Sequence, residues 1–452
     1  MSPNAMLAGM STKAYRRWRA VLLLVVIFAA YRLTLHWMVE AKLNAISAQG
    51  LPVTLAELNQ WYPTPPPGEN AATLYSNAWA NIAQPSANAR EALPMPVGQA
   101  SGPKRGEALS PETKAATAAY LAGNKHALEL LHQAVAGAPC RYPIDLRNWF
   151  SSDPDHFYDH LTALRQAAKL LELESIYRVN DGDLPAAVKS LTALLTLAQS
   201  LDNEPGNIAC LVQAEARRRA VDGIEYLASR TQFSSGQVEE FASELSEADR
   251  IEVLVHAVIS QRCIGCEAFA TDPCIYMEIV QNLTHVTRLS RSQLPLPYSI
   301  AYTIYSVAGL LAVDQLVFLK KCETYLDRIQ SSSSQVIELG RWEQLPSYNY
   351  FTRLLISDLN QMTTRFLDTQ ARLRIARTAL AIERRRGGNA DVPKGLNELV
   401  PDILNAIPND TFTNQPLRYK ELAKGYVVYS VGEDGKDDGG DDKKDITFTV
   451  ER

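Results

Sequence analysis

Apolar and polar positions divide the chain into three stretches with different periods. Eleven uninterrupted apolar residues run from Ala20 to Ala30, and the apolar character continues to Val39. From about residue 111 to residue 386, apolar residues recur every three or four positions, which is typical of amphipathic helices. Beyond Gly388, short alternating runs such as YVVYSV and DITFTV replace this pattern. The sequence therefore predicts a mainly α-helical protein that ends in a small α+β module with antiparallel strands.

The N-terminal apolar stretch has the length of a transmembrane helix when it is counted over residues 20–39. Trp18 and Trp37 stand where interfacial aromatic residues are expected, and Arg32 is long enough to extend its charge toward the interface. The basic segment RRWR at residues 16–19 precedes the span, and positive charge favours the cytoplasmic side. These features predict a cytoplasmic tail over residues 1–19 and a single-pass anchor in the inner (cytoplasmic) membrane, with the body extracytoplasmic or periplasmic.

A cleaved signal peptide is the alternative interpretation of this stretch. Eleven apolar residues match the length of a signal-peptide core. No small-residue cleavage motif follows the run in the expected place, and helical character continues through residues 40–47. We therefore expect an uncleaved anchor, and both interpretations export the body.

The middle of the chain predicts helices joined by short breaks. Residues 40–110 contain four prolines between 63 and 67 and predict an extended linker with short helices. Residues 111–340 predict the helical body, in which the segment 160–201 is a helical hairpin broken by NDGD. Because no fixed repeat length recurs, we expect a bundle or an irregular solenoid. Further helices are predicted at 204–229, 235–268, 272–290, 297–331 and 346–386, with a linker at the serine run 331–335.

Composition excludes some classes of function. A net charge of −5 without a basic domain or stripe argues against nucleic-acid binding. The motif CIGC at Cys263 and Cys266 resembles half of a zinc site or a redox motif, but the nearby Cys274 supplies only a third ligand. Buried thiols or one local disulfide are the simpler interpretation.

One cluster has the composition of a catalytic site. The segment SSDPDHFYDH holds Asp153, Asp155, His156, Asp159 and His160. On a helix, the two imidazoles would lie one turn apart and could share a metal ion, although no third ligand is evident. The alternative is the solvated start of a helix, with an aspartate as its cap. No nucleophile, zinc or phosphate-binding motif is present, so the sequence does not predict an enzyme.

The C-terminal residues 345–452 form an ordered series of short motifs. A helix ends in ALAIERRRGG, a PKGLNEL segment follows, and IPNDTF, PLRY and YSVGEDG come next, before an acidic loop that ends at Asp445. In order and spacing, these motifs resemble the C-terminal domain of the major pseudopilins (protein G) of type II secretion systems. The resemblance implies a long helix that leads into a small antiparallel sheet. It covers about a sixth of the chain.

The resemblance also implies a calcium site in the acidic loop. By match to the family loop, Ser430 and Val431 would supply backbone oxygens and Asp445 a carboxylate. Lys443 replaces an acidic residue of the family, so Asp441 or Asp442 would substitute, with Asp434 and Asp438 also in the loop. Independently, carboxylates crowded among glycines suit Ca²⁺, which takes six to eight oxygen ligands from flexible loops. A solvated acidic loop without a cation is the alternative.

The rest of the chain departs from the pseudopilin pattern. It has no leader cleavage motif before the apolar helix and no glutamate early in that helix, and a long helical region separates the helix from the module. We therefore do not expect this chain to polymerise. The sequence predicts a membrane-anchored extracytoplasmic scaffold that binds protein partners. The alternatives are a membrane-anchored hydrolase that uses the cluster at 153–160 and an accessory component of a type II secretion or pilus-like machine.

Overall fold

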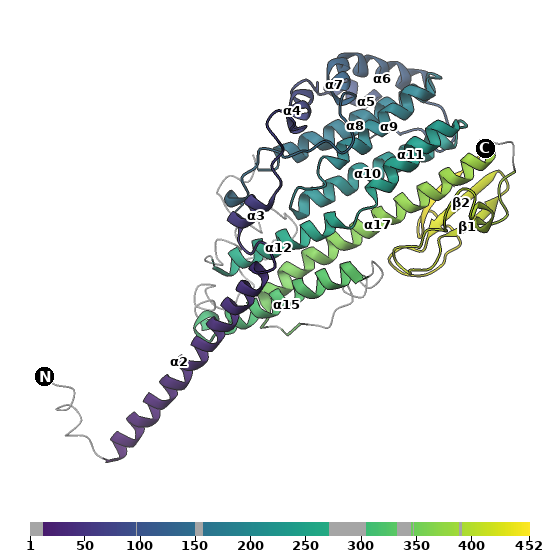
Figure 1. Cartoon of the computed structure of the whole chain (residues 1–452). Helices are drawn as coiled ribbons and strands as arrows, with labels where there is room; N and C mark the ends of the chain where they lie inside the picture. The colour runs from purple at the N-terminus through teal and green to yellow at the C-terminus, as the bar shows by residue number, and fades with distance from the viewer. Residues whose placement is uncertain are drawn as a thin grey trace.

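The computed structural model describes residues 12–95, 97–149, 157–270, 304–331, 345–346, 348–387 and 391–452. Helices hold 63% of the described residues, which confirms the prediction of a mainly α-helical protein with an N-terminal apolar helix and a small antiparallel sheet. Figure 1 shows a long body of stacked helices, from which the N-terminal helix projects at one end and to which the sheet is attached near the other.

The N-terminal helix α2 spans Thr12–Ser47 without a break. It therefore continues well past both ends of the predicted span at residues 20–39. The predicted linker contains three short helices, α3 (Leu55–Trp61), α4 (Ala72–Ala80) and α5 (Ala87–Ala92). Leu58 and Tyr62 are fully buried, so this part of the chain packs against the body.

The helices of the body confirm most of the predicted segments. Their bounds are α6 Pro111–Gly123, α7 Lys125–Leu131, α8 Asp159–Asn180, α9 Leu184–Gln199, α10 Asn207–Ala228, α11 Ser235–Ala248, α12 Glu252–Ala270, α15 Leu310–Ser331 and α17 Tyr350–Gly387, with a 3₁₀ turn, η1, at Leu146–Asn148. The predicted hairpin is α8 and α9, and Asp183 caps α9 by accepting the backbone N–H of Ala186 at 3.1 Å. The predicted helix 272–290 lies outside the described residues, as do residues 332–335 of the serine run, whereas Ser331 is the last residue of α15.

The prediction of one helix over residues 235–268 is wrong. The chain leaves the helix at Asp249, and α11 and α12 are separate. The Asp249 carboxylate accepts a hydrogen bond at 2.9 Å from the guanidinium of Arg374 on α17, and Arg377 lies 3.9 Å away. This ion pair between distant segments stabilises the break.

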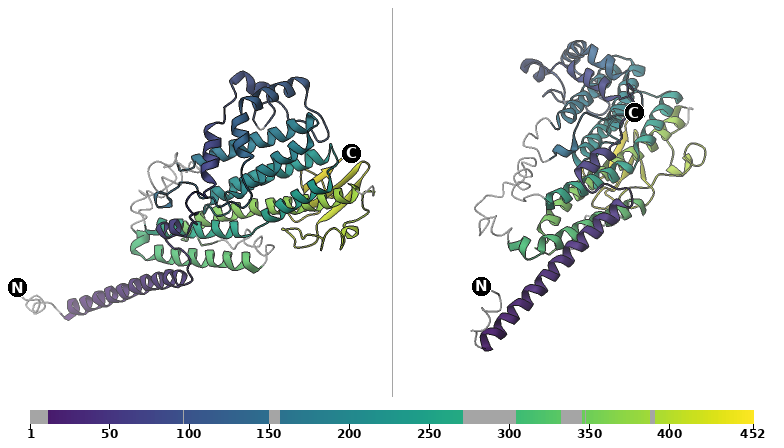
Figure 2. Two further views of the ribbon diagram at one scale, coloured as in Figure 1. Left: turned by 45° about the horizontal axis from the view of Figure 1, so that its top comes forward. Right: turned by 60° about the vertical axis from the view of Figure 1, so that its left-hand side comes forward.

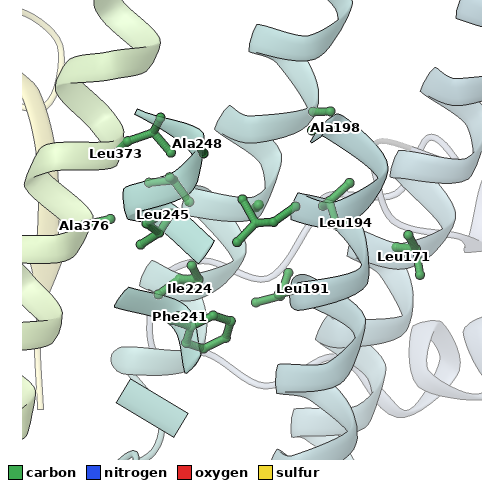
Figure 3. Close-up of a cluster of buried hydrophobic side chains, with 14 of the residues drawn as sticks. Leu171, Leu191, Leu194, Ala198, Ile224, Phe241, Leu245, Ala248, Leu373 and Ala376 are labelled. Atoms are coloured by element: carbon green, nitrogen blue, oxygen red, sulfur yellow. The ribbon is translucent and has the colours of Figure 1, made fainter. Parts of the chain in front are cut away.

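The larger hydrophobic core lies where α8, α9, α10, α11 and α17 meet (Figure 3). Leu191 and Leu194 of α9 point toward Ile224 of α10, while Phe241 of α11 lies on the same side (Figure 3). A second core is formed by α3, α12, α15 and the first half of α17. The long helix α17 contributes to both cores and so connects the two ends of the body.

The C-terminal sheet has three antiparallel strands in the order β1 (Arg418–Leu422), β2 (Gly425–Ser430) and β3 (Ile446–Val450). A short 3₁₀ helix, η3 (Leu396–Leu399), precedes it. The sheet packs on α17, and β3 also touches α10. Val428 and Phe448 belong to the larger core, so the sheet and the helices share one continuous interior.

Candidate functional site

The first half of α2 stands free of the body. The exposed fractions of the side chains from Val21 to Phe28 range from 43% to 65%. Figure 2 shows this part of the helix extending away from all other described elements. Eight consecutive apolar side chains in water would be costly, because each buried side chain of this size is worth roughly 1.5–3 kcal/mol. The exposed surface therefore needs an apolar environment.

Length and composition alone allow two stretches to cross a membrane, Tyr15–Ser47 and Ser235–Ala270. Only 6% of the most apolar part of the first stretch is buried inside the protein, against 78% for the second. The second stretch comprises α11 and α12, which are core helices of the body. Among the described residues, α2 is thus the candidate anchor.

The second half of α2 is held against the body. Leu35 and Val39 are buried, and the ammonium of Lys42 lies 2.6 Å from the carboxylate of Glu323 on α15. Arg32 donates a hydrogen bond of 2.6 Å to the backbone carbonyl of Ser306. Arg32 was predicted to extend toward the interface, and the structure instead shows its charge directed to the segment before α15.

The acidic loop connects β2 and β3, as its two flanking β-like runs predicted. Asp434, Asp437 and Asp441 each accept the backbone N–H of the residue two positions later, at 3.0 Å. This arrangement is typical of aspartate in turns. The ammonium of Lys444 lies 2.8 Å from the carboxylate of Asp438. The loop is thus held by local hydrogen bonds and, within the loop itself, by the Lys444–Asp438 ion pair.

Backbone conformation explains the glycines of this loop. Gly432, Gly435, Gly439 and Gly440 all have φ between 68° and 79°, in the left-handed region. Other residues adopt this region only with strain. The four glycines therefore allow the loop to turn repeatedly.

The predicted calcium ligands do not share one environment. Asp434, Asp441 and Asp442 are exposed, and Ser430 is buried, where its hydroxyl accepts the N–H of Gly432. The N–H of Val431 is donated to Asp410. Among the described residues, no three carboxylate, imidazole or thiol side chains gather closely enough to hold a metal ion.

Asp445 differs from the other acidic residues of the loop. It is 6% exposed, and one carboxylate oxygen accepts the N–H of Gly440 at 2.8 Å. The other oxygen, Oδ1, is buried without a hydrogen-bond partner. A buried acceptor without a partner is costly and is commonly satisfied by a water or an ion. Among the predicted ligands, Asp445 therefore differs in having a buried carboxylate oxygen without a partner, whereas Asp434, Asp441 and Asp442 are exposed.

Two residues that support the loop were not predicted as part of the site. The buried carboxylate of Asp410, in IPNDTF, accepts the backbone N–H groups of Val431 and Phe412 at 3.1 and 2.8 Å. Arg418 of PLRY lies 3.0 Å from Asp437, and the N–H of Gly439 and this guanidinium lower the pKa of Asp437. The motif order placed both residues near the loop, but only the fold shows that Asp410 binds its start and Arg418 its middle.

The Asp/His cluster is only partly described. Asp153, Asp155 and His156 lie outside the described residues. Asp159 is in the first turn of α8, and His160 is buried, with its Nε2 at 2.8 Å from Glu204. His160 therefore pairs with a carboxylate from the loop between α9 and α10, inside the core.

The described cysteines are all buried and free of disulfides. Cys263 and Cys266 lie on α12, and the thiol of Cys263 donates to the carbonyl of Pro52 at 3.2 Å. Burial raises the pKa of Cys266 to about 12, so its reactive thiolate form is disfavoured. This environment agrees with the interpretation of both residues as core thiols. Cys274 lies outside the described residues.

Comparisons with family models, curated proteins and solved structures find no match for this chain. The fold and the geometry above are therefore the basis for the functional proposal.

Proposed function

We propose that this protein is a membrane-anchored scaffold, whose helical body is held outside the cytoplasm by α2 in the inner membrane. The observation that carries the proposal is the exposed apolar surface of α2 from Val21 to Phe28. The helix rises about 1.5 Å per residue, so Trp18 and Trp37 are roughly 28 Å apart along its axis. This distance matches the hydrocarbon thickness of a bilayer, about 30 Å.

The charge at the two ends of α2 supports the orientation. Arg16, Arg17 and Arg19 are exposed at the N-terminal end, where they favour the cytoplasm. The body is attached at the other end through Lys42 and Glu323. The body would therefore lie on the extracytoplasmic side.

A scaffold role is supported by the form of the body. His160 is buried in the core and its Nε2 pairs with Glu204, an arrangement that suits a structural role for this histidine. Apolar side chains are also exposed in segments of the sequence far from α2, for example Met95 and Val135, and they could contact protein partners. The C-terminal module, by its resemblance to major pseudopilins, would be a calcium-stabilised end of this scaffold.

The anchor is tested by replacing Leu24 and Val25 together with arginine in the full-length chain. Each charge near the centre of a span costs about 2.5–3.5 kcal/mol of insertion free energy. We expect the wild-type protein to stay in the membrane after alkaline carbonate extraction and the double variant to be lost from it. Val135→Arg adds a charge at a position that is 69% exposed on the body and is the control.

A reporter fused to the C-terminus then gives the side of the membrane. Alkaline phosphatase activity and protease accessibility from outside the cytoplasm are the expected results. The proposal would be contradicted if carbonate removes the wild-type protein from the membrane, or if the C-terminus lies in the cytoplasm.

The scaffold role is tested with a photo-crosslinking residue at Val135, which should give one discrete adduct in cells.

A further inference from the structure

A cleft of about 310 Å³ lies between the second half of α2 and the body. Its walls come from α2, from the segment between α2 and α3, and from α12 and α15. Figure 1 shows that these elements meet where α2 joins the body. In the proposed orientation, Trp37 marks the outer end of the span, so Glu40 lies just outside it and Arg32 lies about 7.5 Å further into the membrane than Trp37.

Charged side chains line the cleft in a fixed order along α2. Arg32, His36 and Glu40 are four residues apart, so they lie on one face of the helix, with about 6 Å between successive turns. Glu267 of α12 faces the same cleft. The positive groups are therefore nearer to the apolar part of α2, and a carboxylate lies further from it.

These charges are not used by the described part of the protein. No ion pair joins Arg32, His36, Glu40 or Glu267 to another described residue, and the one side-chain hydrogen bond among them is from Arg32 to the Ser306 carbonyl. Arg32 and Glu267 are half-buried. Arg32 and Glu267 thus have no counter-ion among the described residues, and a charge that is partly removed from water without a counter-ion is costly. A ligand with complementary charges would relieve this cost.

Most of the remaining lining is apolar, with Thr54 and Gln315 as the polar exceptions. Val39 and Leu43 of α2 and Phe269 of α12 complete the walls. A ligand that fits must therefore combine a negative group, a positive group and a hydrocarbon part. Aminophospholipids have these three parts, with the phosphate next to the acyl region and the ammonium at the end of the headgroup.

We propose that this cleft binds the headgroup of an aminophospholipid, with its phosphate at Arg32 and His36 and its ammonium at Glu40 and Glu267. The inference rests on the proposed membrane anchor. A primary ammonium donates hydrogen bonds to carboxylates, whereas a quaternary ammonium has no N–H to donate. The site would therefore prefer phosphatidylethanolamine to phosphatidylcholine, and to phosphatidylglycerol, which has no cation.

The experiment uses the full-length protein in detergent micelles that contain equal amounts of phosphatidylethanolamine, phosphatidylcholine and phosphatidylglycerol. Native mass spectrometry measures which lipid stays bound. We expect one phosphatidylethanolamine to be retained with a preference of about tenfold, since one charge-assisted contact is worth at least that factor. Soluble phosphoethanolamine, added at millimolar concentration, should not displace it.

Two variants separate the parts of the site, and two others serve as controls. Arg32→Gln should reduce retention of all three lipids, because the phosphate contact is lost. The double variant Glu40→Gln/Glu267→Gln should retain the lipid but reduce the preference to about one. Arg19→Gln, at the other end of α2, and Glu91→Gln, an exposed position on α5, are the matched controls and should behave like the wild type.

Equal retention of the three lipids by the wild type, or a preference that survives the double glutamate change, would overturn the inference. Displacement by soluble phosphoethanolamine would show that the ligand is a small molecule and not a lipid. Carbonate extraction of the cell membranes, carried out before detergent is added, shows whether a negative result concerns the lipid site alone or also the anchor. A protein that stays in the membrane without a lipid preference contradicts only this site, whereas a protein that is extracted contradicts the anchor as well.

Discussion

Glu383 on α17 holds the C-terminus of the chain in place, and its replacement by glutamine tests how the sheet is attached to the helices. The side chain is 2% exposed. Its carboxylate accepts hydrogen bonds from the guanidinium of Arg386 and the hydroxyl of Tyr426, both at 3.0 Å, and from the guanidinium of Arg452. One carboxylate thus joins α17, β2 and the last residue of the chain.

The expected loss of stability follows from the charges that the substitution leaves without a partner. Glu383→Gln preserves the shape of the side chain but leaves Arg386 and Arg452 without their counter-ion. These guanidinium groups belong to side chains that are only 14% and 16% exposed. Removal of one partner from a buried ion pair costs about 3–5 kcal/mol. Because both arginines keep some contact with water, we expect a loss of about 3 kcal/mol in the free energy of unfolding.

The assay is urea-induced unfolding of the full-length protein in detergent, followed by circular dichroism. Glu398→Gln is the matched control, because Glu398 also pairs with an arginine of α17, Arg385, but at a surface where the two side chains are 38% and 28% exposed. Exposed pairs contribute about 0–1 kcal/mol. The double variant Glu383→Gln/Arg452→Gln should lose less than the sum of the single changes, since each removes the same contact. Equal losses for Glu383→Gln and Glu398→Gln would refute the reasoning.

Three further substitutions test separate features. Burial raises the pKa of Glu225 from 4.5 to about 7, so the free energy of unfolding should fall by about 3 kcal/mol as the pH rises from 4.5 to 7. Urea titrations at several pH values measure this fall, and Glu225→Gln should remove it. Gly425→Ala should lower the midpoint of thermal unfolding sharply, because φ is 111° and the new Cβ would overlap the backbone carbonyl of Val450. Gly236 has open space around it, so the control Gly236→Ala should change the midpoint little. Millimolar Ca²⁺ should raise the midpoint of thermal unfolding relative to a sample with chelator, because a ligand that binds the folded state stabilises it. Asp445→Asn should abolish this shift. An equal shift in the wild type and the variant would exclude Asp445 as a ligand.

Local signals predicted much of the fold. The hairpin of α8 and α9 was predictable because NDGD contains its own break and cap, and Asp183 does cap α9. The strands β2 and β3 follow from alternating apolar residues on both sides of the acidic loop. The break at Asp249 was not predictable, because its partner Arg374 lies 125 positions away and no local residue signals the end of the helix.

In the candidate sites as well, features that depend on neighbouring residues were predictable from the sequence, whereas features that depend on distant residues were not. The turns of the acidic loop depend on aspartates and glycines within two or three positions, so the sequence predicts a turning, acidic connection. The burial of Asp445 and the support from Asp410 depend on how the segment before β1 packs under the end of β2. The cleft beside α2 could not be predicted from the sequence either, because Arg32 and Glu267 line one cleft only when α12 packs near α2.

The long helix α17 gives the protein one continuous support from the anchor to the sheet. Its 38 residues span roughly 57 Å at the rise of an α-helix. The first half packs with α12 and α15, and α15 in turn holds α2. The second half, from Ala371 to Ile382, belongs to the core that also contains the sheet. Because one unbroken helix belongs to both cores, the sheet cannot turn relative to the anchor without disrupting side-chain packing in one of them. In the proposed orientation, such a body would hold the C-terminal module at a fixed distance from the membrane.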